Sequence, residues 1–204
     1  MFERKSRILI PDNTPLSVLS LLGEAALDWL FMPGAEVWIT DMVKEEALRD
    51  PDPGSDPRHG QRQILRRWFE QNASRIHVQP SSEGDEYRKA MEAWRLTGNL
   101  PHLKPSWADR GEVSIFQALK AADAVLESGE AVLVIMDDRR ARAALRTLGY
   151  DLDLMSSESF VSWMAEEYRL PGADTAWQTI KMVMSDAVPR LRPDDDEPIS
   201  TFSM

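Results

Sequence analysis

Short apolar runs alternate along the chain with longer stretches in which apolar residues recur every three or four positions. The short runs predict strands, and the longer stretches predict the helices between them. The predicted strands comprise residues 7–11, 37–40, 75–79, 131–136 and 151–154. The predicted helices comprise residues 15–31, 41–47, 61–73, 83–96, 111–126, 138–148, 157–168 and 173–187. This alternation is typical of an α/β fold with a doubly wound, mostly parallel five-stranded sheet flanked by helices.

Proline, glycine and short polar residues mark the interruptions of this pattern. The segments 50–60 and 97–107 contain Pro and Gly and are predicted to be loops. Asp41 is the predicted N-cap of the second helix, and Gly149 fits the end of helix 138–148. The expected organisation is a main domain over residues 1–161, a C-terminal helical extension over 162–188, and a disordered acidic tail over 189–204.

Acidic side chains follow two of the predicted strands directly. Asp12 comes after the first strand, and Asp137 and Asp138 come after the fourth. Because ligands of such sheets bind outside the carboxyl ends of the strands, these acids are candidates for a functional site. Carboxylates gathered at one edge repel one another unless a cation lies between them.

Two further acidic pairs occur near the starts of predicted helices. Glu45 and Glu46 lie in the helix after the second strand, and Asp109 and Glu112 lie at the start of the helix before the fourth. Right-handed connections would place these helix starts at the same sheet edge. The parallel topology thus gathers acids from four distant segments.

Four segments resemble the sequence motifs of the PIN-domain superfamily, including its VapC-type toxins and a predicted-nuclease branch. They are residues 8–14, 39–46, 111–118 and 134–142, the last followed by Gly149. The resemblance covers roughly residues 7–161. It implies a site built from Asp12, Glu46, Glu112 and Asp138. In this resemblance Glu46 is preferred to Glu45 because it lies three residues after a valine.

A metal-dependent endoribonuclease is the function that the resemblance implies, with Mg²⁺ or Mn²⁺ as cofactor. Asp12 and Asp138 would be direct metal ligands, while Glu46 and Glu112 would bind a second ion or position water. Asn13 and Thr14 would donate hydrogen bonds to the scissile phosphate or to the ligand carboxylates.

Each of the remaining acids also has a purely structural interpretation. Glu45 fits a solvated helix position, and Asp109 fits an N-cap. Asp137 fits a capping group or a residue that supports the ligands.

The composition narrows the chemistry. Cysteine is absent, and the three histidines do not have the spacing of a zinc site. Carboxylates without histidine or thiolate ligands favour hard cations such as Mg²⁺ or Mn²⁺. A net charge of −10 argues against a protein that coats nucleic acid by charge alone.

A group of arginines follows the last acid of the predicted site. Arg139 and Arg142 are candidates for contacts with RNA phosphates, together with Arg140 and Arg146. A solvated helix face paired with acids is the alternative interpretation.

RNA is the expected substrate, and an antitoxin protein is an expected partner if the chain is a toxin. The apolar residues of helices 157–168 and 173–185 would pack on the domain or form a homodimer. No membrane segment or secretory signal is recognised, so a cytoplasmic location is expected. The alternative function is a non-catalytic PIN-like module that binds RNA or protein. Receiver domains and haloacid-dehalogenase-like phosphatases fit the acidic positions less well.

Overall fold

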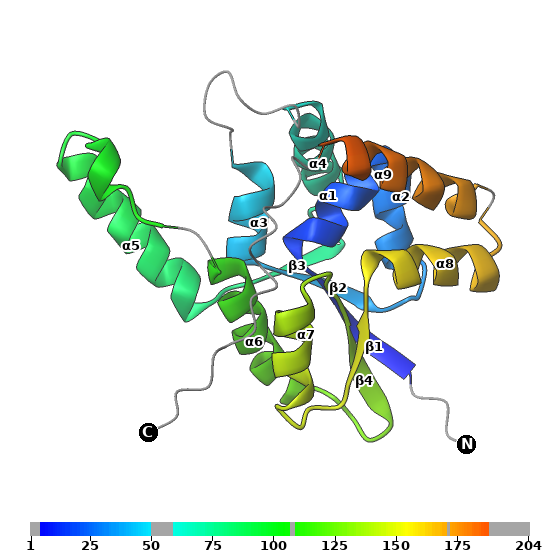
Figure 1. Ribbon diagram of the computed structural model, residues 1–204. Helices are drawn as coiled ribbons and strands as arrows, with labels where there is room; N and C mark the ends of the chain where they lie inside the picture. The colour runs from blue at the N-terminus through cyan, green and yellow to red at the C-terminus, as the bar shows by residue number, and fades with distance from the viewer. Residues whose placement is uncertain (1–4, 50–58, 107–108, 171, 188–204) are drawn as a thin grey trace, which may run out of the picture.

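The computed structural model describes residues 5–49, 59–106, 109–170 and 172–187. Within these residues the fold is α/β, with an all-parallel five-stranded sheet of order β3-β2-β1-β4-β5 flanked by helices (Figure 1). The strands are β1 (Lys5–Pro11), β2 (Glu36–Thr40), β3 (Ile76–Gln79), β4 (Glu130–Ile135) and β5 (Leu152–Met155). The predicted doubly wound fold is therefore confirmed. β1 and β4 lie side by side at the centre, so the residues that follow them meet at one edge.

Helices cover both faces of the sheet. They are α1 (Asn13–Leu21), α2 (Glu24–Leu27), α3 (Asp41–Leu48), α4 (His59–Gln71), α5 (Ser82–Leu96), α6 (Arg110–Asp123), α7 (Arg139–Arg146), α8 (Ser157–Glu167) and α9 (Ala173–Ala187), with 3₁₀ turns η1 (Asp28–Phe31) and η2 (Pro101–Leu103). In Figure 1, α6 and α7 lie on one side of the sheet, whereas α1, α2, α8 and α9 gather on the other. The helices between β1 and β2 and those that lead into and out of β4 thus lie on opposite faces, as right-handed crossovers require.

The first predicted helix, residues 15–31, is wrong as a single element. The chain leaves α1 after Leu21, and Gly23 adopts φ +100°, a conformation that a helix cannot contain. α2 and η1 follow as separate short turns. The apolar residues kept their spacing across this break, which is why periodicity alone did not reveal it.

The expected N-cap of α3 is also wrong. Thr40 is the cap, and its hydroxyl accepts a hydrogen bond from the backbone N–H of Val43 at 3.2 Å. Asp41 instead directs its carboxylate to α5, where it accepts hydrogen bonds from Ser81 Oγ at 2.6 Å and Arg88 Nη1 at 2.9 Å. α3 is therefore tied to the neighbouring helix through Asp41.

Both segments predicted to be loops contain residues that belong to helical turns. Residues 50–58 lie outside the described part of the chain, but His59 and Gly60 belong to α4 and not to a loop. The segment after α5 includes the 3₁₀ turn η2. α5 extends away from the body of the protein (Figure 1). Its base is held by Asp41 and by an ion pair between Glu83 and Arg110 of α6.

The core is formed around β1 and β4 and includes the C-terminal helices. β4 is buried from Ala131 to Ile135, as its uninterrupted apolar run indicated. Phe160 and Met164 of α8 and Ile180 of α9 are also buried. These three side chains are thus packed within the chain, whereas Met182 of α9 is exposed. The proposed boundary at residue 161 falls within α8 and stays a prediction, and the tail 189–204 lies outside the described residues.

No helix in the described ranges combines the length and the apolar character needed to cross a bilayer.

Candidate functional site

Asp12 lies at the carboxyl edge of the sheet, between the ends of the two central strands. Its backbone N–H donates to the carbonyl of Ile135 at 2.9 Å, which fixes the residue beside the end of β4. Asp12 stands at the N-cap position of α1, but its carboxylate makes no capping hydrogen bond. The side chain is half-buried. Asp12 is thus positioned by the backbone, and its carboxylate is left for another role.

The pKa of Asp12 is raised to about 7, chiefly because the carboxylate is removed from water. A backbone hydrogen bond from Asn13 lowers it in part. Three further carboxylates raise it, those of Glu46, Glu112 and Asp137. Negative charge from distant segments of the sequence therefore converges on Asp12.

Glu46 reaches this edge from α3 and is held between α1 and α6. Asn13 Nδ2 donates to Glu46 Oε1 at 2.8 Å. On the other side, a Cβ atom placed on Gly111 would lie 3.0 Å from Glu46 Oε2. The missing side chain at Gly111 thus allows the carboxylate to approach the first turn of α6. Glu45 is exposed and lines a separate groove between α3 and α5.

Glu112 lies in the first turn of α6 and is half-buried. We call Asp12, Glu46, Glu112 and Asp138 the acid cluster. Its pKa is raised, first by burial and then by the negative charges of Asp138, Asp109 and Glu46. Asp109 is exposed and adopts a left-handed backbone with φ +63° at the N-cap position, but its side chain does not cap the helix. Asp109 therefore adds negative charge near Glu112 without belonging to the cluster.

The two acids after β4 already have structural hydrogen bonds. Asp138 is exposed and caps α7, because its Oδ1 accepts from the N–H of Ala141 at 2.7 Å. Asp137 accepts from both the N–H and the hydroxyl of Ser157, at 2.8 and 2.6 Å. Asp137 thereby joins the end of β4 to the start of α8. Asp138 is near enough to Glu112 to raise its pKa, while Asp137 does the same to Asp12.

A small polar cavity borders the cluster where α1, α3 and α4 meet. Its lining residues are Asn13, Ser17, Glu46, Ala47, Gln61, Arg62 and Leu65. Its volume of about 30 Å³ is enough for roughly one water molecule. Asn13 Oδ1 is buried and has no hydrogen-bond partner among the residues that the structure describes. A buried amide oxygen without a donor favours occupation by a water or a cation.

The donor set fits a hard cation, although the side chains are not yet arranged around one. All donors at the edge are carboxylate or amide oxygens, which Mg²⁺ and Mn²⁺ prefer. Over residues 5–49, 59–106, 109–170 and 172–187, no three acidic or histidine side chains are close enough together to hold an ion as they stand. Binding a metal would require rotation of at least one carboxylate.

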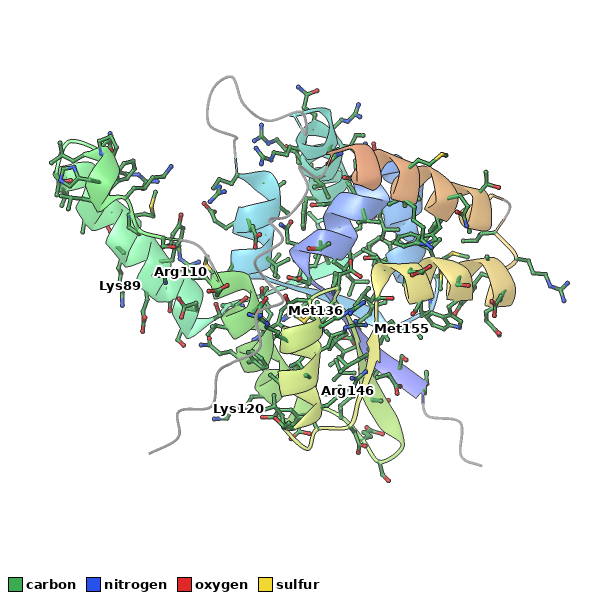
Figure 2. The ribbon with its side chains drawn as sticks, viewed as in Figure 1. Lys89, Arg110, Lys120, Met136, Arg146 and Met155 are labelled. Atoms are coloured by element: carbon green, nitrogen blue, oxygen red, sulfur yellow. The ribbon has the colours of Figure 1, made fainter. Side chains whose placement is uncertain are left out.

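The remaining sequence candidates lie around the cluster. Thr14 is half-buried in the first turn of α1. Arg139 is exposed at the start of α7. Arg142 is half-buried, and its Nε is enclosed without a hydrogen-bond partner in the described part of the chain. The carboxyl ends of β4 and β5 beside this helix are marked by Met136 and Met155 in Figure 2.

The roles of two residues in the site were not predicted from the sequence. Ser157 fixes Asp137, but twenty residues separate them and no local pattern links them. Gly111 permits the approach of Glu46; the only signal for it was the Gly-Glu pair at positions 111 and 112.

Neither a protein-family model nor a curated protein matches this chain. The interpretation of the site therefore depends on its own residues and geometry.

Proposed function

We propose that this protein is a metal-dependent endoribonuclease that hydrolyses RNA phosphodiesters at the carboxyl edge of β1 and β4. The observation that carries the proposal is the environment of Asp12. This half-buried carboxylate is surrounded by the charges of Glu46, Glu112 and Asp137, which together with burial raise its pKa to about 7. Such mutual repulsion between acids is costly for folding and is typical of sites that bind cations.

Asp12, Glu46, Glu112 and Asp138 would hold Mg²⁺ or Mn²⁺. When bound, the metal supplies a Lewis acid that polarises a phosphodiester oxygen and lowers the pKa of an attacking water. Asn13 positions Glu46 through the 2.8 Å hydrogen bond to its Oε1. Ser157 holds Asp137 beside the cluster, where its negative charge favours cation binding.

Cleavage of a mixed RNA pool in the presence of Mg²⁺ or Mn²⁺ tests the proposal. Glu46→Gln and Asp12→Asn are expected to lower the rate at least a hundredfold, about the effect of removing one strong electrostatic contribution. Glu45→Gln is the matched control, because it removes the same charge from the same helix at an exposed position outside the cluster. Glu45→Gln is expected to cleave like the wild type.

Equal cleavage by the wild type and Asp12→Asn would contradict the proposal. Equal losses in Glu45→Gln and Glu46→Gln would show that the net charge of α3 matters and not the placement of one carboxylate.

A non-catalytic module that binds RNA or protein is the second candidate function. It is favoured by the capping hydrogen bond of Asp138, which occupies one oxygen of a carboxylate that would hold the metal. This candidate predicts RNA or protein binding without turnover. Metal-dependent turnover that is lost in the acid variants would exclude it.

The antitoxin partner, the homodimer and the cytoplasmic location expected from the sequence belong to the toxin form of this proposal. Burial of Phe160, Met164 and Ile180 within one chain leaves less apolar surface on α8 and α9 for a dimer. Light scattering over a range of protein concentrations measures the oligomeric state directly.

A further inference from the structure

Helix α7 is strongly basic in a chain that is acidic as a whole. Its eight residues, Arg-Arg-Ala-Arg-Ala-Ala-Leu-Arg, include four arginines and no acid, whereas the whole chain has a net charge of −10. None of these arginines forms an ion pair with another residue of the described ranges. The alternative noted from the sequence, a helix face paired with acids, is therefore not what the fold provides.

Three of the arginines form a row that begins at the acidic edge. Arg142 and Arg146 follow Asp138 at intervals of four residues, and Arg139 lies three residues before Arg142. With 3.6 residues per turn, these positions share one flank of the helix. We call Arg139, Arg142 and Arg146 the arginine row. Arg140 lies on the other flank of the exposed face, about 100° from Arg139.

The buried side of α7 fixes the direction of this row. Ala141 and Leu145 pack into the core. Arg139 and Arg146 are exposed at the two ends of the helix. In Figure 2 the label of Arg146 lies at the end of α7 that is remote from Met136, the residue that follows β4. The row therefore leads from the acidic edge outward over the surface.

Arg142 in the middle of the row has an unmet donor. Its Nε is buried and has no hydrogen-bond partner in the ranges that the structure describes. Leaving a charged donor without a partner is unfavourable, and a planar guanidinium binds the oxygens of a phosphate or carboxylate particularly well. An anion bound beside Arg142 would satisfy this donor.

We propose that the arginine row binds the phosphate backbone of an RNA strand and leads it to the acidic edge. The proposal rests on the proposed function for the direction of the strand. The row spans the eight residues of α7, so its ends are about 10 Å apart at 1.5 Å per residue, which is comparable to the rise of about three stacked nucleotides. It also supplies the positive charge that a polyanion needs to approach a carboxylate cluster.

An RNA strand is favoured over an acidic protein segment by the position of the row. The row starts at Arg139, directly after Asp138, so a strand bound along it brings a phosphodiester next to the acids. An acidic peptide bound at the same place would bring negative charge to the cluster without bringing a phosphodiester that the proposed site could cleave.

Fluorescence anisotropy of a labelled single-stranded RNA oligonucleotide tests the row directly. Titrations contain EDTA to prevent cleavage and are repeated over a series of salt concentrations. Three phosphate contacts contribute about 2 to the slope of log K against log salt, because each contributes about 0.7 on a single strand. Arg146→Gln is expected to reduce this slope by about 0.7 and to weaken binding.

Arg140→Gln is the matched control, since it removes the same charge from the same helix on the other flank. It is expected to leave the slope unchanged. Thermal melting of each variant verifies that the protein remains folded. Equal reductions in slope for Arg140→Gln and Arg146→Gln would overturn the row. Stronger binding of a poly-glutamate peptide than of RNA would also overturn it, in favour of an acidic protein partner.

The two proposals fail in different ways. If Asp12→Asn cleaves like the wild type while Arg146→Gln still weakens RNA binding, the proposed function is wrong and the row stands. If cleavage depends on the acids while Arg146→Gln binds RNA like the wild type, the row is wrong and the proposed function stands.

Discussion

At the scale of single residues, Asp12 combines a structural position with an electrostatic cost. Its backbone is fixed to Ile135, so the carboxylate cannot leave the edge without disturbing the junction of β1 and β4. Burial and three neighbouring carboxylates oppose its ionisation. The folded protein therefore holds a proton at Asp12 at pH values where the unfolded chain has released it.

Asp12→Asn is expected to stabilise the metal-free protein at pH 8 but not at pH 4.5. The pKa of Asp12 rises from 3.8 to about 7 on folding, so its ionisation lowers the free energy of unfolding as pH increases through this window. Asparagine does not ionise, so above pH 7 the free energy of unfolding of the variant is expected to exceed that of the wild type by about 2 to 4 kcal/mol. Urea unfolding in EDTA at both pH values measures it.

Asp153→Asn is a suitable comparison, because Asp153 is exposed on β5. It is expected to change stability little and equally at both pH values. A destabilised Asp12→Asn at pH 8 would mean that the ionised carboxylate is a favourable partner in the fold.

At the scale of elements, α7 depends on a residue that is also a candidate metal ligand. Asp138 caps the helix through Ala141, and asparagine can accept the same hydrogen bond. Asp138→Asn is therefore expected to change the free energy of unfolding by less than about 0.5 kcal/mol, whereas Asp138→Ala costs about 1 kcal/mol. Thermal or urea unfolding of the two variants separates these values.

RNA cleavage assays of the same pair separate the two roles of Asp138. If Asp138 binds metal, cleavage falls strongly in both variants although only one loses the cap. Wild-type cleavage by Asp138→Asn would restrict this residue to capping.

Strands were easier to predict than helix ends, for physical reasons. A buried parallel strand such as β4 must be apolar on both faces, and a continuous apolar run shows this directly. A helix end depends on a single turn. The conformation of Gly23 ends the predicted helix 15–31 early. Thr40 caps α3 in place of Asp41, whose carboxylate accepts a hydrogen bond from Ser81 at the start of α5. These choices are made by tertiary contacts that local patterns do not contain.

In the candidate site, too, the positions of residues were easier to predict than their side-chain contacts. Strand-end positions placed Asp12 and Asp138 at one edge, because parallel topology determines where such residues meet. The capping bond of Asp138, the hydrogen bond of Asn13 to Glu46 and the hold of Ser157 on Asp137 depend on side-chain rotamers. Neither spacing nor composition specifies those rotamers.

At the scale of the whole molecule, cation binding is expected to couple to folding. A cation that binds only the folded state adds about 2.7 kcal/mol of stability at a hundredfold excess over its Kd. Mn²⁺ is expected to raise the melting temperature of the wild type at pH 8, and to raise that of Asp12→Asn less. Thermal melts over a Mn²⁺ series after dialysis against EDTA measure both. The same rise in both proteins would place the metal elsewhere.

The strand order also bears on how the protein is made. β1 pairs with β2 on one side and with β4 on the other, and β4 begins at Glu130. On the ribosome, more than one hundred residues are added between the end of β1 at Pro11 and the start of β4. During that time one edge of the apolar strand β1 has no partner, which is the kind of edge that chaperones must cover. Asp138 leaves the ribosome later still, so the acid cluster cannot be complete in any shorter nascent chain. Any activity that requires all four acids would therefore begin only after Asp138 has left the ribosome.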